Sequence, residues 1–175
     1  RTPTGAQLIE ELAELCGKVS TFFCDLNLRR GHVVRDRVLR SLELCQILKL
    51  NEEELDFLAQ TTGLSGTIHQ RIELISSRFK IHLVALTLGK AGSILYSESG
   101  FSVSAGTIVS EPVNTVGAGD AFAAALAVGV LKNEKPEQIQ EQAGRLAAAV
   151  CLLPGAVPEN DEFYDAFFSE EITEE

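Results

Sequence analysis

A glycine turn that leads into an alanine-rich stretch holds the residues best suited to chemistry: Gly117, Ala118, Gly119 and Asp120. Two glycines around one alanine let the backbone turn sharply and leave amide N–H groups free where a helix starts. Such amides favour a bound anion such as phosphate. An anion site next to a carboxylate base is what phosphoryl transfer to a hydroxyl requires. The same residues also fit a plain helix start, in which Asp120 caps the first free amides.

Three further polar positions come directly after apolar, β-prone runs. The runs at 19–24, 46–50 and 81–88 are followed by Asp25, Asn51 and Gly89. Ligands of α/β sheets bind outside the carboxyl ends of the strands. We therefore expect these positions, together with Gly117–Asp120, to meet at one rim of one sheet.

The spacing of apolar residues predicts the elements that carry these positions. Helices are expected at 4–17, opened by a capping box of Thr4 and Gln7, and at 34–44, 52–60, 68–79, 118–131 and 136–153. A hairpin is expected from 93–96 and 101–104. Strands that alternate with helices indicate an α/β fold with a mostly parallel central sheet flanked by helices.

Residues 114–122 resemble the signature of the PfkB/ribokinase family of sugar and nucleoside kinases, Asp-Thr-x-Gly-Ala-Gly-Asp-x-Phe, with Asn114 at the first position. Residues 25–29, 49–54 and 87–92 match further family segments in the family's order, and Gly155-Ala156 resembles its closing Gly-Ala. The resemblance implies a ribokinase-like fold and ATP-dependent phosphorylation of a sugar or sugar-acid hydroxyl. The Asp-x-Asn-x-Arg form of 25–29 looks most like the fructokinase and 2-keto-3-deoxygluconate kinase branches.

The resemblance also implies roles for single residues. Asp120 would take the proton of the acceptor hydroxyl, while Gly117, Ala118 and Gly119 form an anion hole. Asn51 and Glu54 would organise Mg²⁺ and the ATP phosphates, often through water; by themselves they also fit a helix capping pair. The remaining nucleotide contacts would come from Thr87 and Gly89 at the phosphates and from Gly144 at adenine, although Gly144 also fits a close helix-packing glycine.

The acceptor and a monovalent cation are expected at two other segments. Asp25, Asn27 and Arg29 alternate, so in an extended chain they face one side and suit a polyhydroxy ligand. In the family, an Asp at position 114 helps to hold K⁺ with backbone carbonyls, here such as that of Val116. Asn114 keeps an oxygen ligand but loses the charge, which leaves K⁺ activation open.

Composition limits the class of protein. A formal charge of −10 and a pI near 4.8 exclude a nucleic-acid partner, because phosphate contacts need a basic face. No apolar run approaches the roughly 20 residues of a membrane span, and no signal peptide opens the chain, so a cytoplasmic location is expected. The four cysteines form no Cys-x-x-Cys pair and read as free thiols. The expected partner is a small sugar, and a homodimer is left open.

Members of the family carry a longer portion ahead of the segment that matches 25–29, with the first strands, much of the sugar pocket and a β lid. Fewer than 25 residues precede Asp25. We therefore expect 1–175 to form one α/β nucleotide-binding domain, incomplete at its N-terminus, without those strands and that lid. Two alternatives stay open: a kinase-like binding or regulatory protein without turnover, and a nucleoside kinase of the same family.

Overall fold

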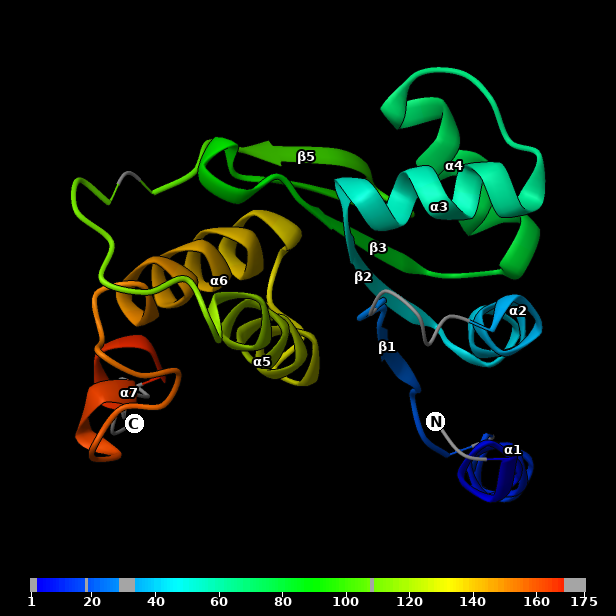
Figure 1. Cartoon of the computed structure of the whole chain (residues 1–175), viewed down its shortest axis with the longest axis horizontal. Coiled ribbons are helices and arrows are strands. Elements are labelled where there is room, and N and C mark those ends of the chain that lie inside the picture. The colour runs from blue at the N-terminus through cyan, green and yellow to red at the C-terminus, as the bar shows by residue number, and fades with distance from the viewer. Residues whose placement is uncertain (1–2, 18, 29–33, 108, 169–175) are drawn as a thin grey trace, which may run out of the picture. The chain divides into compact units, whose positions relative to one another are not determined.

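A computed structural model describes residues 3–17, 19–28, 34–107 and 109–168 (Figure 1). The chain divides into two compact units. The first unit comprises 1–89 and 93–103, and the second comprises 90–92 and 104–175. Within the described residues, no helix is long and apolar enough to cross a bilayer.

The first unit is built on a five-stranded sheet whose strands lie in chain order. β1 pairs with β2, and β2 with β3, in parallel, whereas β3 and β4 are antiparallel. β4 and β5 form the predicted hairpin, which makes the sheet mixed. The strands are β1 (Phe23–Asp25), β2 (Ile47–Asn51), β3 (Leu83–Thr87), β4 (Ser93–Ser97) and β5 (Gly100–Ser104).

Helices cover one face of this sheet. Leu48 and Leu50 of β2 and Leu86 of β3 are fully buried in an apolar cluster with residues of α2, α3 and α4. The helices of the first unit are α1 (Pro3–Cys16), α2 (Arg35–Leu44), α3 (Glu52–Thr62) and α4 (Ile68–Phe79). A short 3₁₀ turn, η1 (Gly89–Ala91), follows β3 and belongs mostly to the second unit.

The other face of the sheet is polar near the carboxyl ends of the strands. Successive side chains of a strand point to opposite faces, so Lys49 and Asn51 share the face that Leu48 and Leu50 do not use. Lys49 is the register partner of Asp25, and Asn51 is the register partner of Thr87. The carboxyl ends of β1, β2 and β3, which were predicted to share one rim, therefore lie at the same edge of the sheet.

The second unit is helical. α5 (Ala118–Leu131) and α6 (Pro136–Val150) pack against each other, and α7 (Glu162–Phe168) follows. A Cβ at Gly129 of α5 would lie 2.6 Å from Cγ1 of Ile139 in α6, so this glycine permits the close approach of the two helices. α6 opens with a proline in its first turn, where the missing N–H costs no hydrogen bond.

Some predicted boundaries were wrong. Thr4 lies inside α1 and does not cap it, because the helix already begins at Pro3. β1 covers only 23–25, since the amides of Val19 and Ser20 turn back to the carbonyl of Cys16. α6 ends at Val150, where the amide of Leu153 bonds three residues back and tightens the turn. The sequence did not reveal α7.

Candidate active site

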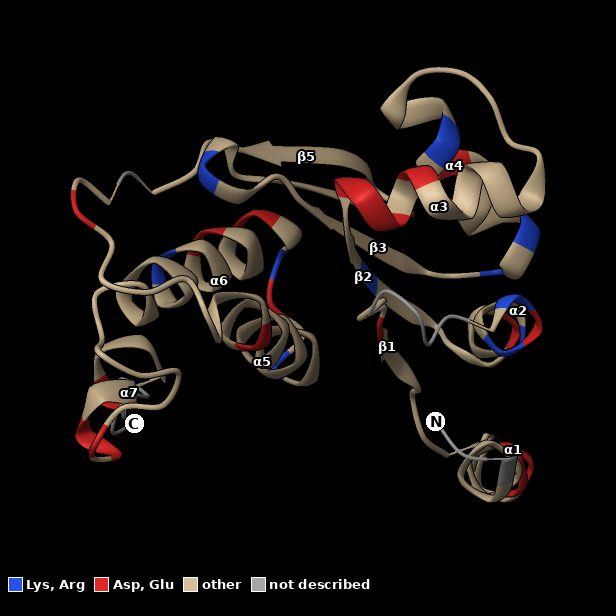
Figure 2. Cartoon of the chain, viewed as in Figure 1, with Lys and Arg blue, Asp and Glu red and all other residues tan. Residues whose placement is uncertain are grey.

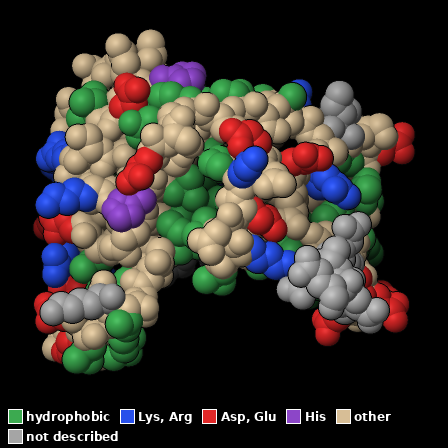
Figure 3. All heavy atoms as spheres, turned by 180° about the vertical axis from the view of Figure 1, so that it is seen from behind, with side chains coloured by type: hydrophobic (Ala, Val, Ile, Leu, Met, Phe, Trp, Pro, Cys, Tyr) green, Lys and Arg blue, Asp and Glu red, His purple; other side chains and the backbone are tan. Residues whose placement is uncertain are grey.

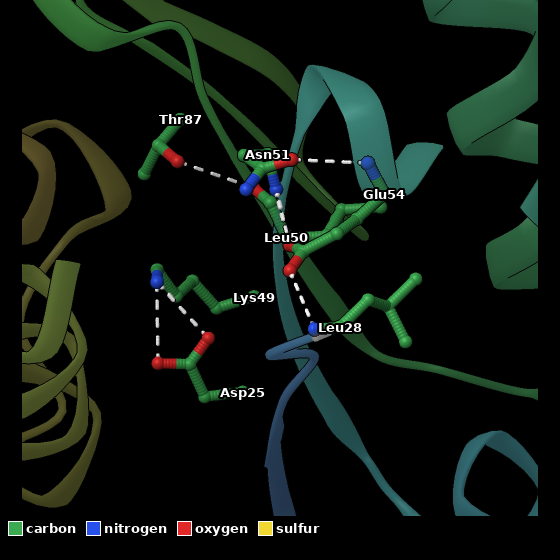
Figure 4. A network of polar contacts seen from close by, with 7 residues as sticks. All are labelled: Asp25, Leu28, Lys49, Leu50, Asn51, Glu54 and Thr87. Atoms are coloured by element: carbon green, nitrogen blue, oxygen red, sulfur yellow. Dashed lines mark hydrogen bonds and ion pairs between the residues drawn. The ribbon is translucent and has the colours of Figure 1, made fainter. Parts of the chain in front are cut away.

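Asn51 and Glu54 form the predicted capping pair at the start of α3 (Figure 4). The side-chain oxygen of Asn51 accepts from the Glu54 amide at 3.0 Å, and the Asn51 amide donates to Glu54 Oε2 at 2.8 Å. The other carboxylate oxygen, Oε1, accepts from the Leu28 amide at 3.1 Å. Burial raises the pKa of Glu54, although the amides of Asn51 and Leu28 oppose the shift. Glu54 thus ties α3 to the chain that follows β1.

This geometry bears on how Mg²⁺ could be held. Both oxygens of Glu54 already accept a backbone N–H, and no group of three or more His, Cys, Asp or Glu suited to a metal occurs among the described residues. Mg²⁺ keeps several of its waters when it binds to proteins. Asn51 and Glu54 therefore fit contact through water and do not form a direct ligand cage.

Asp25 forms an ion pair that the sequence did not suggest. Nζ of Lys49 lies 3.0 and 3.2 Å from the two carboxylate oxygens of Asp25. The Lys49 side chain is 10% exposed and that of Asp25 is 26% exposed. The available signal was a lysine inside the apolar run 46–50, but its partner depends on the pairing of β1 with β2.

The predicted alternation of Asp25, Asn27 and Arg29 does not describe the chain after β1. The Asn27 amide donates to the Asp25 carbonyl at 2.9 Å, a bond between residues two apart that turns the chain at Leu26. Leu26 is buried and Asn27 is exposed. The argument from an extended chain is therefore wrong here, and Arg29 lies outside the described residues.

Thr87 and Gly89 follow at the end of β3. The Thr87 hydroxyl donates to the Leu50 carbonyl at 3.3 Å, next to its register partner Asn51. Gly89 has a φ of +56°, and nothing lies within 4 Å of the position that a Cβ would take. The backbone conformation favours glycine there, and the space beside it is open.

The glycine turn in the second unit forms the start of α5. Gly117 precedes the helix with a φ of +88°, and a Cβ there would lie 2.8 Å from the Cβ of Ala156. The predicted closing Gly-Ala thus packs against the turn. The Ala118 amide donates to the Thr115 carbonyl at 3.3 Å, so this amide of the predicted anion hole already has a partner.

The amides of Gly119 and Asp120 remain available. Within the described residues neither donates to a backbone carbonyl, and the exposed carboxylate of Asp120 accepts no hydrogen bond. Asp120 is the third residue of α5 and does not cap it. The alternative of a capping aspartate is therefore wrong.

Asn114 orders the segment before the turn. Its side-chain oxygen accepts from the Val116 amide at 2.9 Å, and its own amide donates to the Cys151 carbonyl at 3.2 Å. An Asx turn of this kind fixes the local backbone. Asn114 therefore has a structural task besides the predicted contact with a cation.

Gly144, on α6, has nothing within 4 Å of a possible Cβ. A glycine selected for close helix packing would meet a neighbouring atom there. The interpretation of Gly144 as a packing glycine is wrong, and the open space beside it leaves the adenine contact as a prediction.

The site residues thus fall into two groups. Asp25, Asn51, Glu54 and Thr87 come together at the rim of the first unit, and Asn114, Gly117 and Asp120 lie along one segment of the second. The model of the pfkB family carbohydrate kinases matches residues 2–162, which include all of them. This chain belongs to the PfkB family. Its sheet and helices form the ribokinase-like α/β fold.

Curated relatives of this PfkB chain include bacterial fructokinases. The fructokinase of Klebsiella pneumoniae is 36% identical over 119 residues, which are 66% of this chain and 36% of that protein. The fructokinase of Salmonella thompson is 34% identical over 98 residues, 55% of this chain and 42% of that protein. The chain spans less than half the length of these relatives.

Solved structures share the fold. A 2-dehydro-3-deoxygluconokinase from Thermotoga maritima superposes with a TM-score of 0.77 at 20% identity, over 92% of this chain and 55% of that chain. A fructokinase double mutant from Vibrio cholerae, bound to fructose, ADP and a potassium ion, gives a TM-score of 0.74 at 24% identity, again over 92% of this chain and 55% of that chain.

On the face drawn in Figure 3, acidic and basic side chains of the described residues are interspersed.

Proposed function

We propose that this PfkB chain carries the nucleotide-handling part of an ATP-dependent sugar kinase. Its acceptor is the hydroxyl of a fructose-like sugar or of a sugar acid like 2-keto-3-deoxygluconate. The observation that carries the proposal is the start of α5: among the described residues, the amides of Gly119 and Asp120 have no backbone partner, and the carboxylate beside them accepts no hydrogen bond. An anion and a base for a hydroxyl would meet there within one helical turn.

Asp120 would take the proton of the acceptor hydroxyl as the hydroxyl oxygen attacks the γ-phosphate. A positioned general base contributes about 10²- to 10⁴-fold to such a rate. The amides of Gly117 and Gly119, and that of Asp120 itself, would face the negative charge on the transferring group. One well-placed donor of this kind is worth about 10²- to 10³-fold.

The first unit would handle the nucleotide phosphates. Mg²⁺ neutralises phosphate charge when it is bound, and Asn51 and Glu54 would hold its water shell. Thr87 and Gly89 would lie along the phosphates, where the open space beside Gly89 leaves room. The open side of Gly144 would leave room for adenine.

The relatives support the choice of acceptor. The curated fructokinases at 34–36% identity favour a fructose-like sugar. Ribose, 2-keto-3-deoxygluconate and adenosine are the competing acceptors within the family. A phosphorylation screen over all four separates these possibilities.

The decisive variant is Asp120→Asn, measured in the protein as its full gene encodes it. We expect kcat for the preferred acceptor to fall by about 10²- to 10⁴-fold with an unchanged circular dichroism spectrum. Glu137→Gln is the matched control, because Glu137 is an exposed acid in the first turn of α6. A near-normal kcat in a folded Asp120→Asn protein would show that Asp120 is not the general base.

A further inference from the structure

Cys24 and Cys45 bring two thiols together inside the first unit. Cys24 is the middle residue of β1, and Cys45 follows the last residue of α2. The two side chains share a hydrogen bond. Cys45 is 3% exposed and belongs to the apolar cluster between the sheet and its helices, and the partly buried Cys24 packs against that cluster. The phosphoryl transfer proposed above uses neither thiol.

Backbone hydrogen bonds hold the two cysteines close to each other. The amides of Gln46 and Ile47 donate to the carbonyl of Phe22 at 2.9 and 3.2 Å. In return, the Phe22 amide donates to the side-chain oxygen of Gln46 at 2.8 Å. Cys45 directly precedes Gln46, and Cys24 lies two residues after Phe22. The thiols therefore stay neighbours for as long as β1 stays paired with β2.

Cys24 also lines a cavity, which gives the two thiols different access to solutes. A cavity of about 260 Å³ lies between α1, β1 and α2, and Cys24 forms part of its wall. Among the described residues, Cys45 does not belong to that wall. α2, which carries blue basic segments in Figure 2, contributes Arg37, Arg40 and Ser41 to it. A polar cavity of this size admits water and small polar molecules, so an oxidant can reach Cys24 first.

The protonation of the two thiols differs in the same sense. The pKa of Cys24 is lowered by the hydrogen bond from Cys45, although burial and the carboxylates of Asp25 and Glu54 oppose the shift. The pKa of Cys45 is raised by the same hydrogen bond and by burial. The Cys45 S–H can also donate to the carbonyl of Leu42, at 3.7 Å. The thiolate is the nucleophilic form of cysteine, so Cys24 is the thiol suited to react first.

We propose that Cys24 and Cys45 form a reversible disulfide, in which Cys24 reacts with a peroxide and Cys45 resolves the product. The Cys24 thiolate attacks one oxygen of hydrogen peroxide; an S–O bond forms, the O–O bond breaks, and the released hydroxide takes up a proton as water. The sulfur of Cys45 then attacks the Cys24 sulfur, the S–O bond breaks, and the Cys45 proton leaves with the hydroxyl as a second water. Two thiols are oxidised and one peroxide is reduced, and a dithiol such as dithiothreitol reverses the bond by exchange.

This inference goes beyond the proposed function and does not depend on it, because no step involves a nucleotide or a sugar. The bond would join β1 to the end of α2 and close the chain from 24 to 45 into a loop. A cross-link of this kind restricts the unfolded chain, and it stabilises the folded protein where the native geometry accepts the bond.

Peptide mapping of the full-length native protein tests whether the bond forms. Trypsin cleaves after Lys and Arg, so Cys24 falls in peptide 19–29, Cys45 in 41–49, and Cys16 and Cys151 in two others. After treatment with hydrogen peroxide and alkylation of the remaining thiols, we expect 19–29 to be joined to 41–49. The joined mass should be two hydrogen atoms below the sum, and dithiothreitol should separate the peptides. A bond from Cys24 to another cysteine, or a Cys24 that is oxidised without any bond, would overturn the proposal.

Single variants test the two roles. In Cys45→Ala the sulfenic acid of Cys24 has no resolving thiol, so dimedone should label Cys24 in this variant and not in the native protein. Cys24→Ser should lose both the bond and the label. Cys16→Ser and Cys151→Ser are the matched controls and should keep the bond. Equal labelling of native protein and Cys45→Ala would overturn the resolving role of Cys45, and the peptide map of the native protein holds whether or not a variant folds.

Thermal unfolding tests whether the folded structure accepts the bond. The peroxide-treated native protein should melt about 5 °C above the reduced protein, because the bond closes the loop from 24 to 45. Cys24→Ser treated in the same way should show no such rise. An oxidised native protein that melts no higher than the reduced one would show that the bond does not fit the folded unit, and would overturn the proposal.

Discussion

Glu54 accepts one backbone amide with each of its two oxygens, which a glutamine could not do. In Glu54→Gln, one of the amides of Leu28 and Asn51 would face an NH₂ group and lose its acceptor. We expect a loss of about 1–3 kcal/mol in the free energy of unfolding, measured in urea. Glu53→Gln, exposed in the same turn, should change it by less than about 0.5 kcal/mol. Equal stability of the two variants would contradict this role of Glu54.

Glu54 should also make stability depend on pH. Burial raises its pKa in the folded protein above the ordinary value of 4.5, so the folded state binds the proton more tightly than the unfolded state. The stabilisation is complete below pH 4.5 and is lost as the pH rises through the raised pKa. The advantage of the native protein over Glu54→Gln in urea should therefore shrink with rising pH across this window. An advantage that grows with pH would show that the hydrogen bonds outweigh burial.

A variant at Asn114 tests whether a monovalent cation affects the rate. In Asn114→Asp an oxygen remains to accept from the Val116 amide, while a negative charge is added. We expect the variant to show stronger activation by K⁺ than the native protein, measured as kcat with K⁺ exchanged for a large organic cation at constant ionic strength. A rate that ignores K⁺ in both proteins would show that no functional cation site exists.

At the scale of elements, the glycine that precedes α5 and a glycine within α6 should respond to alanine in opposite ways. Alanine at Gly117 would adopt a strained φ of +88° and press on Ala156 at 2.8 Å, so Gly117→Ala should lower the free energy of unfolding by about 1–3 kcal/mol. Alanine at Gly144 meets nothing within 4 Å on α6 and should raise it by about 0.5–1 kcal/mol. Thermal and urea unfolding of both variants test this contrast.

Gly117→Ala and Gly144→Ala also test where ATP binds. If adenine lies beside Gly144, its new methyl group should weaken ATP binding even though the protein becomes more stable. Unchanged ATP affinity in Gly144→Ala would remove Gly144 from the proposed site. Gly117→Ala should weaken ATP binding because it displaces the start of α5.

The spacing of apolar residues predicted the helices well, because a helix is held together by bonds between residues close in sequence. The apolar spacing of 68–79 and 118–131 gave the bounds of α4 and α5 as they are observed. β1 was predicted too long, because its length is set by how far it can pair with β2. The contact of Lys49 with Asp25 depends on the same pairing, so no pattern within β2 alone could reveal it. The turn at Leu26 was missed because a hydrogen bond two residues apart leaves no periodic signal.

At the scale of the whole molecule, α1 presents apolar side chains to solvent. Leu8 and Ile9 are each 56% exposed and Leu15 is 80% exposed, and apolar side chains gather over α1 at the lower left of Figure 3. Contiguous exposed apolar surface favours association. We expect 1–175 to form dimers or larger species in analytical ultracentrifugation, and Leu8→Gln/Leu15→Gln to shift the distribution toward the monomer. Leu131→Gln, 81% exposed at the end of α5, is the control.

The strands of the first unit occupy the sheet in the order in which the chain presents them, β1 to β5. Each strand can therefore add to the edge left by the strand before it, and no later segment has to insert between two that are already paired. Contacts that form in chain order keep the mean sequence separation low, which favours fast folding. The sheet of this unit could grow while the ribosome is still adding residues, with β1 and β2 paired before the helices of the second unit have been synthesised.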